Sequence, residues 1–260
     1  MLLREQLAAR TDLPLETYRR LADDPIPGVR GERAENPAID AALIRMLAAD
    51  RGYDVQRRLA HNRHAPLDVL ACLVGATKIG STLLSRIAAA SPAEVEELAE
   101  LPHPVLRMLL AQRRDLPTGI RDALAADPDA KVVKSVAPHP GLSEVQLRAM
   151  VARHGVRVLA AVASNPDASP VLLEDLARYK PTVHKAYREI ARHPNATAPS
   201  LLACLADRKA RRIAAGHPAL PSPVIVDLLT ADDDWQVVEA AAANPSLPRA
   251  VMYELVPWSS

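Results

Sequence analysis

The sequence contains few aromatic residues and no phenylalanine. Aromatic residues make up 3% of the 260 residues, although hydrophobic residues make up 49%. The core must therefore be built from Ala, Leu, Val and Ile. Side chains of this size let helices approach one another closely, so the composition favours stacked helices over a β-sandwich.

Cysteine is also scarce, because only Cys72 and Cys204 are present and they lie far apart. This excludes a disulfide framework and fits a reducing compartment. No apolar run reaches the length of a membrane span. Residues 1–10 include charges and no apolar segment of the signal-peptide kind. We therefore expect a cytoplasmic protein with no membrane partner, and the frequent Ala, Arg and Pro suggest a bacterial source.

The chain also lacks an excess of either positive or negative charge. The chain has 32 Lys and Arg against 31 Asp and Glu, so its formal net charge is +1. No overall excess marks it as a binder of nucleic acid or of membranes. Any electrostatic signal must come from how the charges are arranged.

Proline, in contrast, is abundant and recurs at regular intervals. There are 23 prolines and 9 glycines. The string ASNP at 163–166 recurs as AANP at 242–245 and as APHP at 137–140. We call the residue at the third position of this string the anchor. Ten anchors follow one another at a mean spacing of 26 residues: Arg10, Asn36, Asn62, Ser91, Arg113, His139, Asn165, His193, His217 and Asn244.

The residues around the anchors define a repeat. Alanine stands two residues before all ten anchors, and an apolar residue stands seven before all ten. This spacing marks one face of a short helix, and the alanine indicates a place where a neighbouring backbone passes closely. Proline after the anchor ends that helix, and a second proline often begins the next one. The sequence therefore predicts an all-α solenoid of about ten helix–turn–helix repeats.

Segments in the C-terminal half resemble a known repeat family. Residues 158–166 followed by 172–177, and residues 234–245, resemble the leucine-rich repeat variant. The resemblance is strongest over 131–256 and continues in register, more divergent, over 1–130. It implies a right-handed superhelix that alternates α-helices with short 3₁₀ or second helices. We expect a single repeat domain over 1–256, with a short tail at 257–260. Some family members carry a Cys-rich iron–sulfur segment before the repeats, but no Cys precedes Cys72 here, so we expect no cofactor.

Candidate catalytic and metal-binding groups are few. The histidines at three anchors are expected to cap turns through a side-chain hydrogen bond, as Asn does elsewhere, and not to bind a metal. Cys72 and Cys204 occupy matching places in second helices, so both are expected to be buried thiols. No GxSxG or HExxH motif and no carboxylate pair stands out.

One arrangement of charged residues departs from the even charge balance of the whole chain. The positions eight and five residues before each anchor lie on one side of the first helix, three residues apart. Basic residues outnumber acidic ones there. This basic ladder consists of Arg57, Arg86, Lys131, Lys134, Arg157, Lys185, Arg188, Lys209 and Arg212.

We expect a non-enzymatic scaffold that binds a protein or peptide along its superhelical groove, with the basic ladder as the candidate binding residues. Nucleic-acid binding by the same residues is an alternative, although stacking aromatics are scarce. An enzyme with a site in the groove is a further alternative, and a small-molecule ligand stays open. The ladder also has a purely structural interpretation, since exposed helix positions are often charged.

Overall fold

The computed structural model describes residues 2–256, which form twenty α-helices, one 3₁₀ turn and no strand. Most helices have seven to eleven residues because prolines set their ends. Pro27, Pro92, Pro104 and Pro170 each begin a helix, where the missing amide hydrogen is not needed. None of the described helices is long and apolar enough to cross a membrane.

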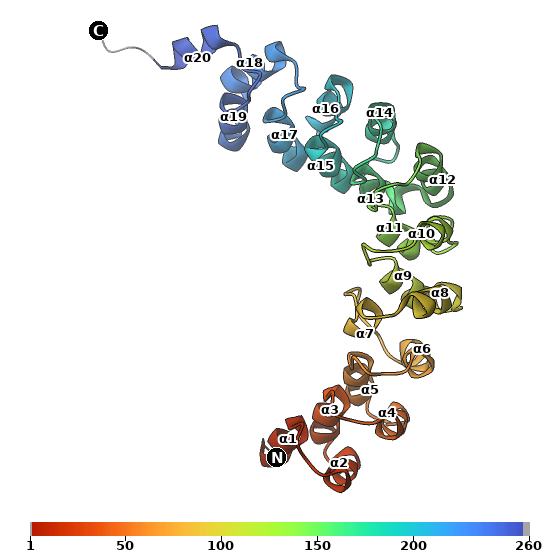
Figure 1. Cartoon of the computed structure of the whole chain (residues 1–260). Helices are drawn as coiled ribbons and strands as arrows, with labels where there is room; N and C mark the ends of the chain where they lie inside the picture. The colour runs from red at the N-terminus through yellow and green to blue at the C-terminus, as the bar shows by residue number, and fades with distance from the viewer. Residues whose placement is uncertain (1, 257–260) are drawn as a thin grey trace. The chain divides into compact units, whose positions relative to one another are not determined.

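The helices contact mainly their neighbours in the sequence, and they fall into two units, residues up to Val136 and from Ala137. In the first unit the first helices of the repeats are α1 (Leu2–Ala9), α3 (Pro27–Glu35), α5 (Tyr53–Ala60), α7 (Ser85–Ala88), α9 (Pro104–Leu110) and α11 (Ala130–Val136). The second helices are α2 (Leu15–Ala22), α4 (Ala41–Ala48), α6 (Leu67–Ala76), α8 (Pro92–Glu100) and α10 (Thr118–Ala125). Figure 1 shows the two sets as two rows.

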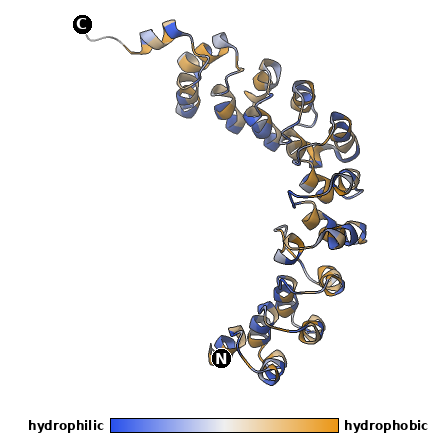
Figure 2. Cartoon of the chain, viewed as in Figure 1, coloured by the Kyte–Doolittle hydropathy of each residue, from blue (hydrophilic) through white to orange (hydrophobic). Residues whose placement is uncertain are grey.

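The second unit repeats this arrangement. Its first helices are η1 (Gly155–Arg157) with α13 (Leu159–Ala163), α15 (His184–Arg192), α17 (Arg208–Ala215) and α19 (Trp235–Ala242). Its second helices are α12 (Glu144–His154), α14 (Pro170–Arg178), α16 (Ala198–Cys204), α18 (Ser222–Ala231) and α20 (Arg249–Leu255). The helices carry both hydrophobic and hydrophilic residues, as the mixed colours of Figure 2 show. The all-α fold with neighbour-to-neighbour packing is as predicted, and the expected tail at 257–260 lies outside the described residues.

Anchor side chains join each repeat to the one before it. The amide nitrogen Nδ2 of Asn165 donates to the carbonyl oxygens of Ala137 and His139, at 2.5 and 2.7 Å. Its Oδ1 accepts from the backbone amide two residues later, at 2.8 Å. Asn36, Asn62 and Asn244 make the same bonds. All four side chains are buried, so each one satisfies main-chain carbonyls that water cannot reach.

Histidine performs this role at the anchors His193 and His217. Nε2 of His217 contacts the carbonyl oxygen of His193 at 3.1 Å, and its Nδ1 accepts from the backbone amide of Ala219 at 3.1 Å. His193 makes the corresponding pair of bonds. The two ring nitrogens thus replace Nδ2 and Oδ1 of asparagine, and the predicted turn capping by anchor histidines is confirmed at these positions.

The alanine column lies mostly where the sequence predicts. Eight of the ten alanines are buried, all at 1% exposure or less: Ala8, Ala34, Ala60, Ala111, Ala137, Ala163, Ala191 and Ala215. Ala8 packs with Val29, the apolar residue seven before the next anchor, so the column receives side chains of the following repeat. Ala242 is exposed because no further first helix follows α19 in the described chain. Ala89 is also exposed, and there the prediction is wrong.

The fourth repeat explains the failure at Ala89. Helix α8 begins directly after Ser91, which caps it through a capping box with Glu94. Ser91 therefore serves as a helix cap and not as an anchor that reaches the preceding repeat. The next anchor, Arg113, reaches the fourth repeat with its guanidinium, since Nη1 donates to the carbonyl oxygens of Ile87 and Ala90 at 2.9 and 2.8 Å.

Candidate functional site

Arginine–aspartate pairs join several adjacent repeats. The arginine stands six residues before one anchor, and the aspartate stands twelve before the next. Four joints contain such a pair: Arg4–Asp24, Arg30–Asp50, Arg107–Asp127 and Arg211–Asp232. The aspartate side chains are at most 9% exposed, and each also accepts from the backbone amide two residues later. These pairs fix the start of each following first helix.

The pair of Arg30 and Asp50 shows how the charges are stabilised. Nε of Arg30 lies 2.5 Å from Oδ2 of Asp50, and Nη1 donates to the carbonyl oxygen of Asp24 at 2.7 Å. The hydrogen bond from Arg30 lowers the pKa of the Asp50 carboxyl, although burial alone would raise it. Such arginines are occupied inside the fold, so they are poor candidates for binding a partner.

Two aspartates in the second unit cap helices and also bind a base of the preceding repeat. Asp234 caps α19 and pairs with Arg212 of the basic ladder at 2.8 Å, while Asp207 caps α17 and lies 2.7 Å from Nδ1 of His184. Burial acts to raise the pKa of both carboxyls, but the hydrogen bonds to backbone amides and to the basic side chains outweigh it, and both pKa values are lowered.

Three ladder residues are paired within the fold. Arg86 is 13% exposed, binds Glu94 and donates to the carbonyl oxygen of Ala65. Arg212 is bound to Asp234. Arg57 forms an exposed pair with Asp54 at 3.4 Å, a contact worth little in water.

The other six ladder residues have no ion pair within the part of the chain that the structure describes. In the first unit these are Lys131 and Lys134, both exposed on α11. In the second unit they are Arg157 on η1, Lys185 and Arg188 on α15, and Lys209 on α17. Arg188 is half-buried and the other three are exposed. The first-helix row of the second unit therefore presents four uncompensated positive charges, which we call the cationic row.

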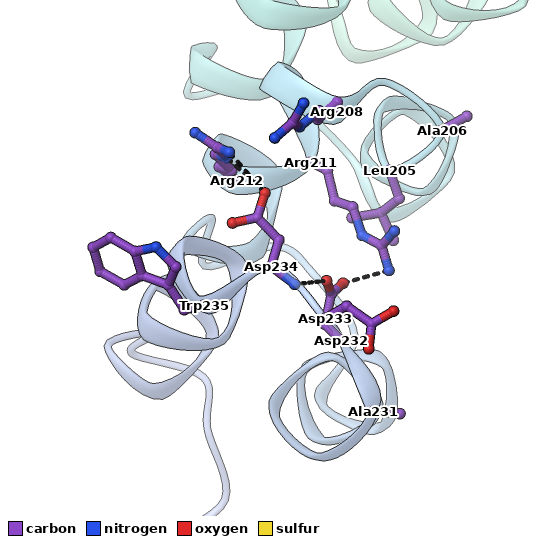
Figure 3. A pocket seen from close by; sticks show the side chains of 10 residues that line it. All are labelled: Leu205, Ala206, Arg208, Arg211, Arg212, Ala231, Asp232, Asp233, Asp234 and Trp235. Carbon is purple, nitrogen blue, oxygen red and sulfur yellow. Dashed lines mark hydrogen bonds and ion pairs between the residues drawn. The ribbon is translucent and has the colours of Figure 1, made fainter.

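An open pocket of about 590 Å³ lies beside this row, between α17 and α19. Figure 3 shows Arg208, Arg211 and Arg212 on one side of it and Asp232 to Asp234 facing them. Two of the three arginines are bound to these aspartates, and Arg208, exposed, has no ion pair among the described residues. Trp235 stands at the edge with 69% of its surface exposed. The pocket holds equal numbers of arginines and aspartates, and it adds an exposed indole beside the cationic row.

Groups that could support catalysis or metal binding lie apart from one another. Within the described residues no three His, Cys, Asp or Glu side chains come together as metal ligands would. Cys204 is buried as predicted, and burial raises the pKa of its thiol to about 12. Cys72 is exposed, so the prediction that both thiols are buried is wrong for Cys72.

The arginine–aspartate pairs were missed from the sequence, although a signal exists. Arg4–Asp24, Arg30–Asp50 and Arg107–Asp127 each span 20 residues, a constant spacing that the anchor pattern hides. Comparing each acidic residue with the arginine 20 residues before it would have distinguished arginines that are paired within the fold from unpaired ones.

Neither a scan against protein families nor a search of curated proteins finds a match to this chain.

Proposed function

We propose that this chain is a right-handed α-solenoid of the leucine-rich repeat variant kind, and that it is a non-enzymatic scaffold binding an acidic segment of a partner protein. Anchor side chains that bond to the repeat before them support the solenoid. The cationic row on the first helices of the second unit supports the choice of partner. In repeat proteins of this class, an extended surface formed by one helix row is the usual binding face.

The observation that carries the proposal is the contrast between paired and unpaired bases. Arg211 and Arg212 form ion pairs with aspartates of the next repeat, whereas Arg157, Lys185, Arg188 and Lys209 have no acidic partner among the described residues. A fold that pairs its joint arginines with acids and leaves one face unpaired concentrates positive potential on that face. Such a face attracts and orients a negatively charged partner.

The spacing of the helices predicts the form of the partner. Packed helices lie about 8–10 Å apart, and an extended peptide advances about 3.3 Å per residue. An extended segment with an acidic side chain at every third residue would therefore match successive first helices. Trp235, at the end of the row, would contact an apolar side chain of the same segment, as exposed indoles commonly do in interfaces.

The test is fluorescence anisotropy with a labelled peptide that carries glutamate at every third position. We expect binding that weakens with salt and that is lost when Arg157, Lys185 and Arg188 are all changed to Glu. A matched control changes Arg19, Arg63 and Arg249 to Glu, which alters the net charge equally. These three are exposed, lie outside the cationic row and have no ion pair among the described residues. The control should retain binding.

Two results would change the conclusion. Equal loss in both triple variants would show that the peptide senses only net charge, and the proposed site would be wrong. A single-stranded oligonucleotide that binds the wild type tightly, with a steep fall in affinity as salt rises, would indicate phosphate contacts. If the peptide does not bind under the same conditions, nucleic-acid binding by the ladder replaces the proposal.

A further inference from the structure

The residue that stands nine positions before each anchor is open to solvent in most repeats. It is the first residue of most first helices, among them Tyr53 on α5, Arg208 on α17 and Trp235 on α19. Eight of the nine such residues that the structure describes are exposed, and Ala130 is half-buried. His184, in a repeat with neighbours on both sides, has 79% of its side chain exposed. The exposure of Trp235 is therefore a property of its position in the repeat.

At one repeat, a residue at this position already binds a non-helical segment of the chain. The hydroxyl of Tyr53 accepts from the backbone amide of Lys78 at 2.9 Å and donates to the carbonyl oxygen of the same residue at 3.4 Å. Lys78 belongs to residues 77–84, which connect α6 to α7 without helical structure. An aromatic side chain at the start of a first helix can thus contact the main chain of a segment beside it, and Tyr53 remains 48% exposed.

In the second unit a guanidinium and an indole occupy this position in successive repeats. Arg208 and Trp235 both line the open pocket of about 590 Å³ between α17 and α19. Figure 3 shows the ion pair of Arg212 and Asp234 between the two side chains. Asp234 also caps α19 by accepting from the backbone amide of Gln236 at 3.1 Å. The ion pair therefore holds the start of the helix that carries the indole, while Arg208 and the indole face solvent.

We propose that this pocket is the specificity site for the acidic segment, with Arg208 pairing an acidic side chain and Trp235 receiving an apolar one. This inference rests on the proposed function and adds a defined order of residues to it. The two side chains start from adjacent first helices, which pack about 8–10 Å apart. An extended chain covers that distance in about three residues. The preferred segment therefore carries an apolar residue three positions beyond its last acidic residue.

The surroundings of the indole favour an apolar residue over a charged one. Three arginines and three aspartates line the pocket, so a charge of either sign placed against Trp235 gains little. An apolar side chain instead covers an indole that is 69% exposed, and it removes apolar surface of both partners from water. Tryptophan and arginine are also the residue types that contribute most often to binding energy at protein interfaces.

The test is fluorescence anisotropy with three labelled peptides that carry glutamate at every third position. Two of them have Leu three positions beyond the glutamates, one at each end, so that both chain directions are sampled. The third has Ala in place of Leu. We expect one Leu peptide to bind at least about tenfold more tightly than the Ala peptide. Trp235→Ala should remove this difference and leave the affinity for the Ala peptide unchanged.

Arg208 is tested by a double-mutant cycle. Arg208→Gln should weaken the Leu peptide, and so should replacing its glutamate nearest to Leu by Gln. If these two groups form an ion pair, the combined change should weaken binding no further than either change alone. Losses that simply add would show that Arg208 does not pair with this residue, and the proposed order of residues would be wrong.

Tyr253→Ala is the matched control, since Tyr253 is an exposed aromatic residue on the second helix α20. It should keep the tenfold difference. In a Trp258→Phe background Trp235 is the only tryptophan, and its emission should shift to shorter wavelength with the Leu peptide but not with the Ala peptide. Equal affinities for all three peptides, or a difference that survives Trp235→Ala, would overturn this inference and leave the proposed function standing. If no peptide binds, both are wrong.

Discussion

The Nε2 atom of His193 lies 2.7 Å from the carbonyl oxygen of Asn165, so the anchors of two successive repeats are bonded directly. Nδ1 of the same ring accepts the backbone amide of Asn195 at 3.0 Å. An amide can only donate and a carbonyl oxygen can only accept, so the ring carries its proton on Nε2. The neutral imidazole in this tautomer is therefore equivalent to an asparagine side chain.

This equivalence predicts that anchor residues are interchangeable. His193→Asn should keep both bonds and lose less than about 1 kcal/mol of unfolding free energy. His193→Ala should lose about 1–3 kcal/mol, because a buried carbonyl and an amide lose their partners. Urea denaturation of the two variants measures the difference. Equal losses would show that packing of the ring, and not its hydrogen bonds, stabilises the joint.

The alanine column predicts a position-dependent effect of one substitution. Ala163→Leu forces a larger side chain into a closed joint and should destabilise the chain by about 1–3 kcal/mol. Ala242→Leu makes the same change at the same repeat position where the side chain is exposed, and stability should change by less than about 0.5 kcal/mol. Thermal unfolding at low protein concentration compares them. A large loss for Ala242→Leu would contradict the exposure of the Ala242 side chain.

Glu94 predicts a pH dependence of stability. Its hydrogen bond with Arg86, followed by that from the Ser91 amide, lowers the pKa of the Glu94 carboxyl from 4.5 to about 2. A lowered pKa stabilises the folded chain above the ordinary value, and this contribution is lost as the pH falls from about 4.5 toward about 2. Glu94→Gln should therefore be less stable than the wild type at neutral pH, and the gap should close over that range.

The matched control for Glu94 is Glu97→Gln on the same helix. Glu97 is exposed and has no ion pair among the described residues. Its substitution should leave the pH profile of urea denaturation unchanged. A gap between Glu94→Gln and the wild type that stays constant down to pH 2 would show that the carboxylate charge contributes nothing to the joint.

The two thiols should differ in reactivity. Cys72 is exposed, whereas the buried Cys204 donates to the carbonyl oxygen of Tyr187 at 3.4 Å, and burial raises the pKa of its thiol to about 12. Thiolate is the reactive form. A thiol reagent should modify one group per native chain and the second only after urea is added. Cys72→Ser should abolish the fast reaction, and two fast equivalents in the wild type would contradict the burial of Cys204.

The sequence predicted those contacts between neighbouring repeats whose residues stand at a constant sequence offset from the anchor. Ala163 and Val158 lie at constant offsets from Asn165, and steric fit to the adjacent helix dictates both, so the periodic pattern reveals them. The anchor bonds were predicted in kind, because Asn and His share a capping role, but their acceptors lie in the preceding repeat and could not be identified from local sequence.

Alignment errors account for what was missed, because Cys72 stands ten residues after Asn62 whereas Cys204 stands eleven residues after His193. Cys72 was aligned with Cys204 through the following leucine, yet Leu73 is buried and Leu205 is half-buried, so the buried positions in α6 and α16 differ by one residue. One residue turns a helix by about 100° and moves a side chain from the core to the surface. The ion pair of Arg212 was missed because Asp234 belongs to the next joint, whose length varies between repeats.

Anchor bonds that connect only adjacent repeats have a consequence for how the chain can change its length. Removing residues 166–193 would place Asn165 directly before Pro194, and His217 could then bond to Asn165 as it now bonds to His193. The anchor bond at the new junction would be complete, although Asp207 would lose its partner His184. In-frame loss of this unit in the coding sequence would thus keep the anchor bond between the repeats on either side, so the number of units can change by one genetic event without breaking that bond.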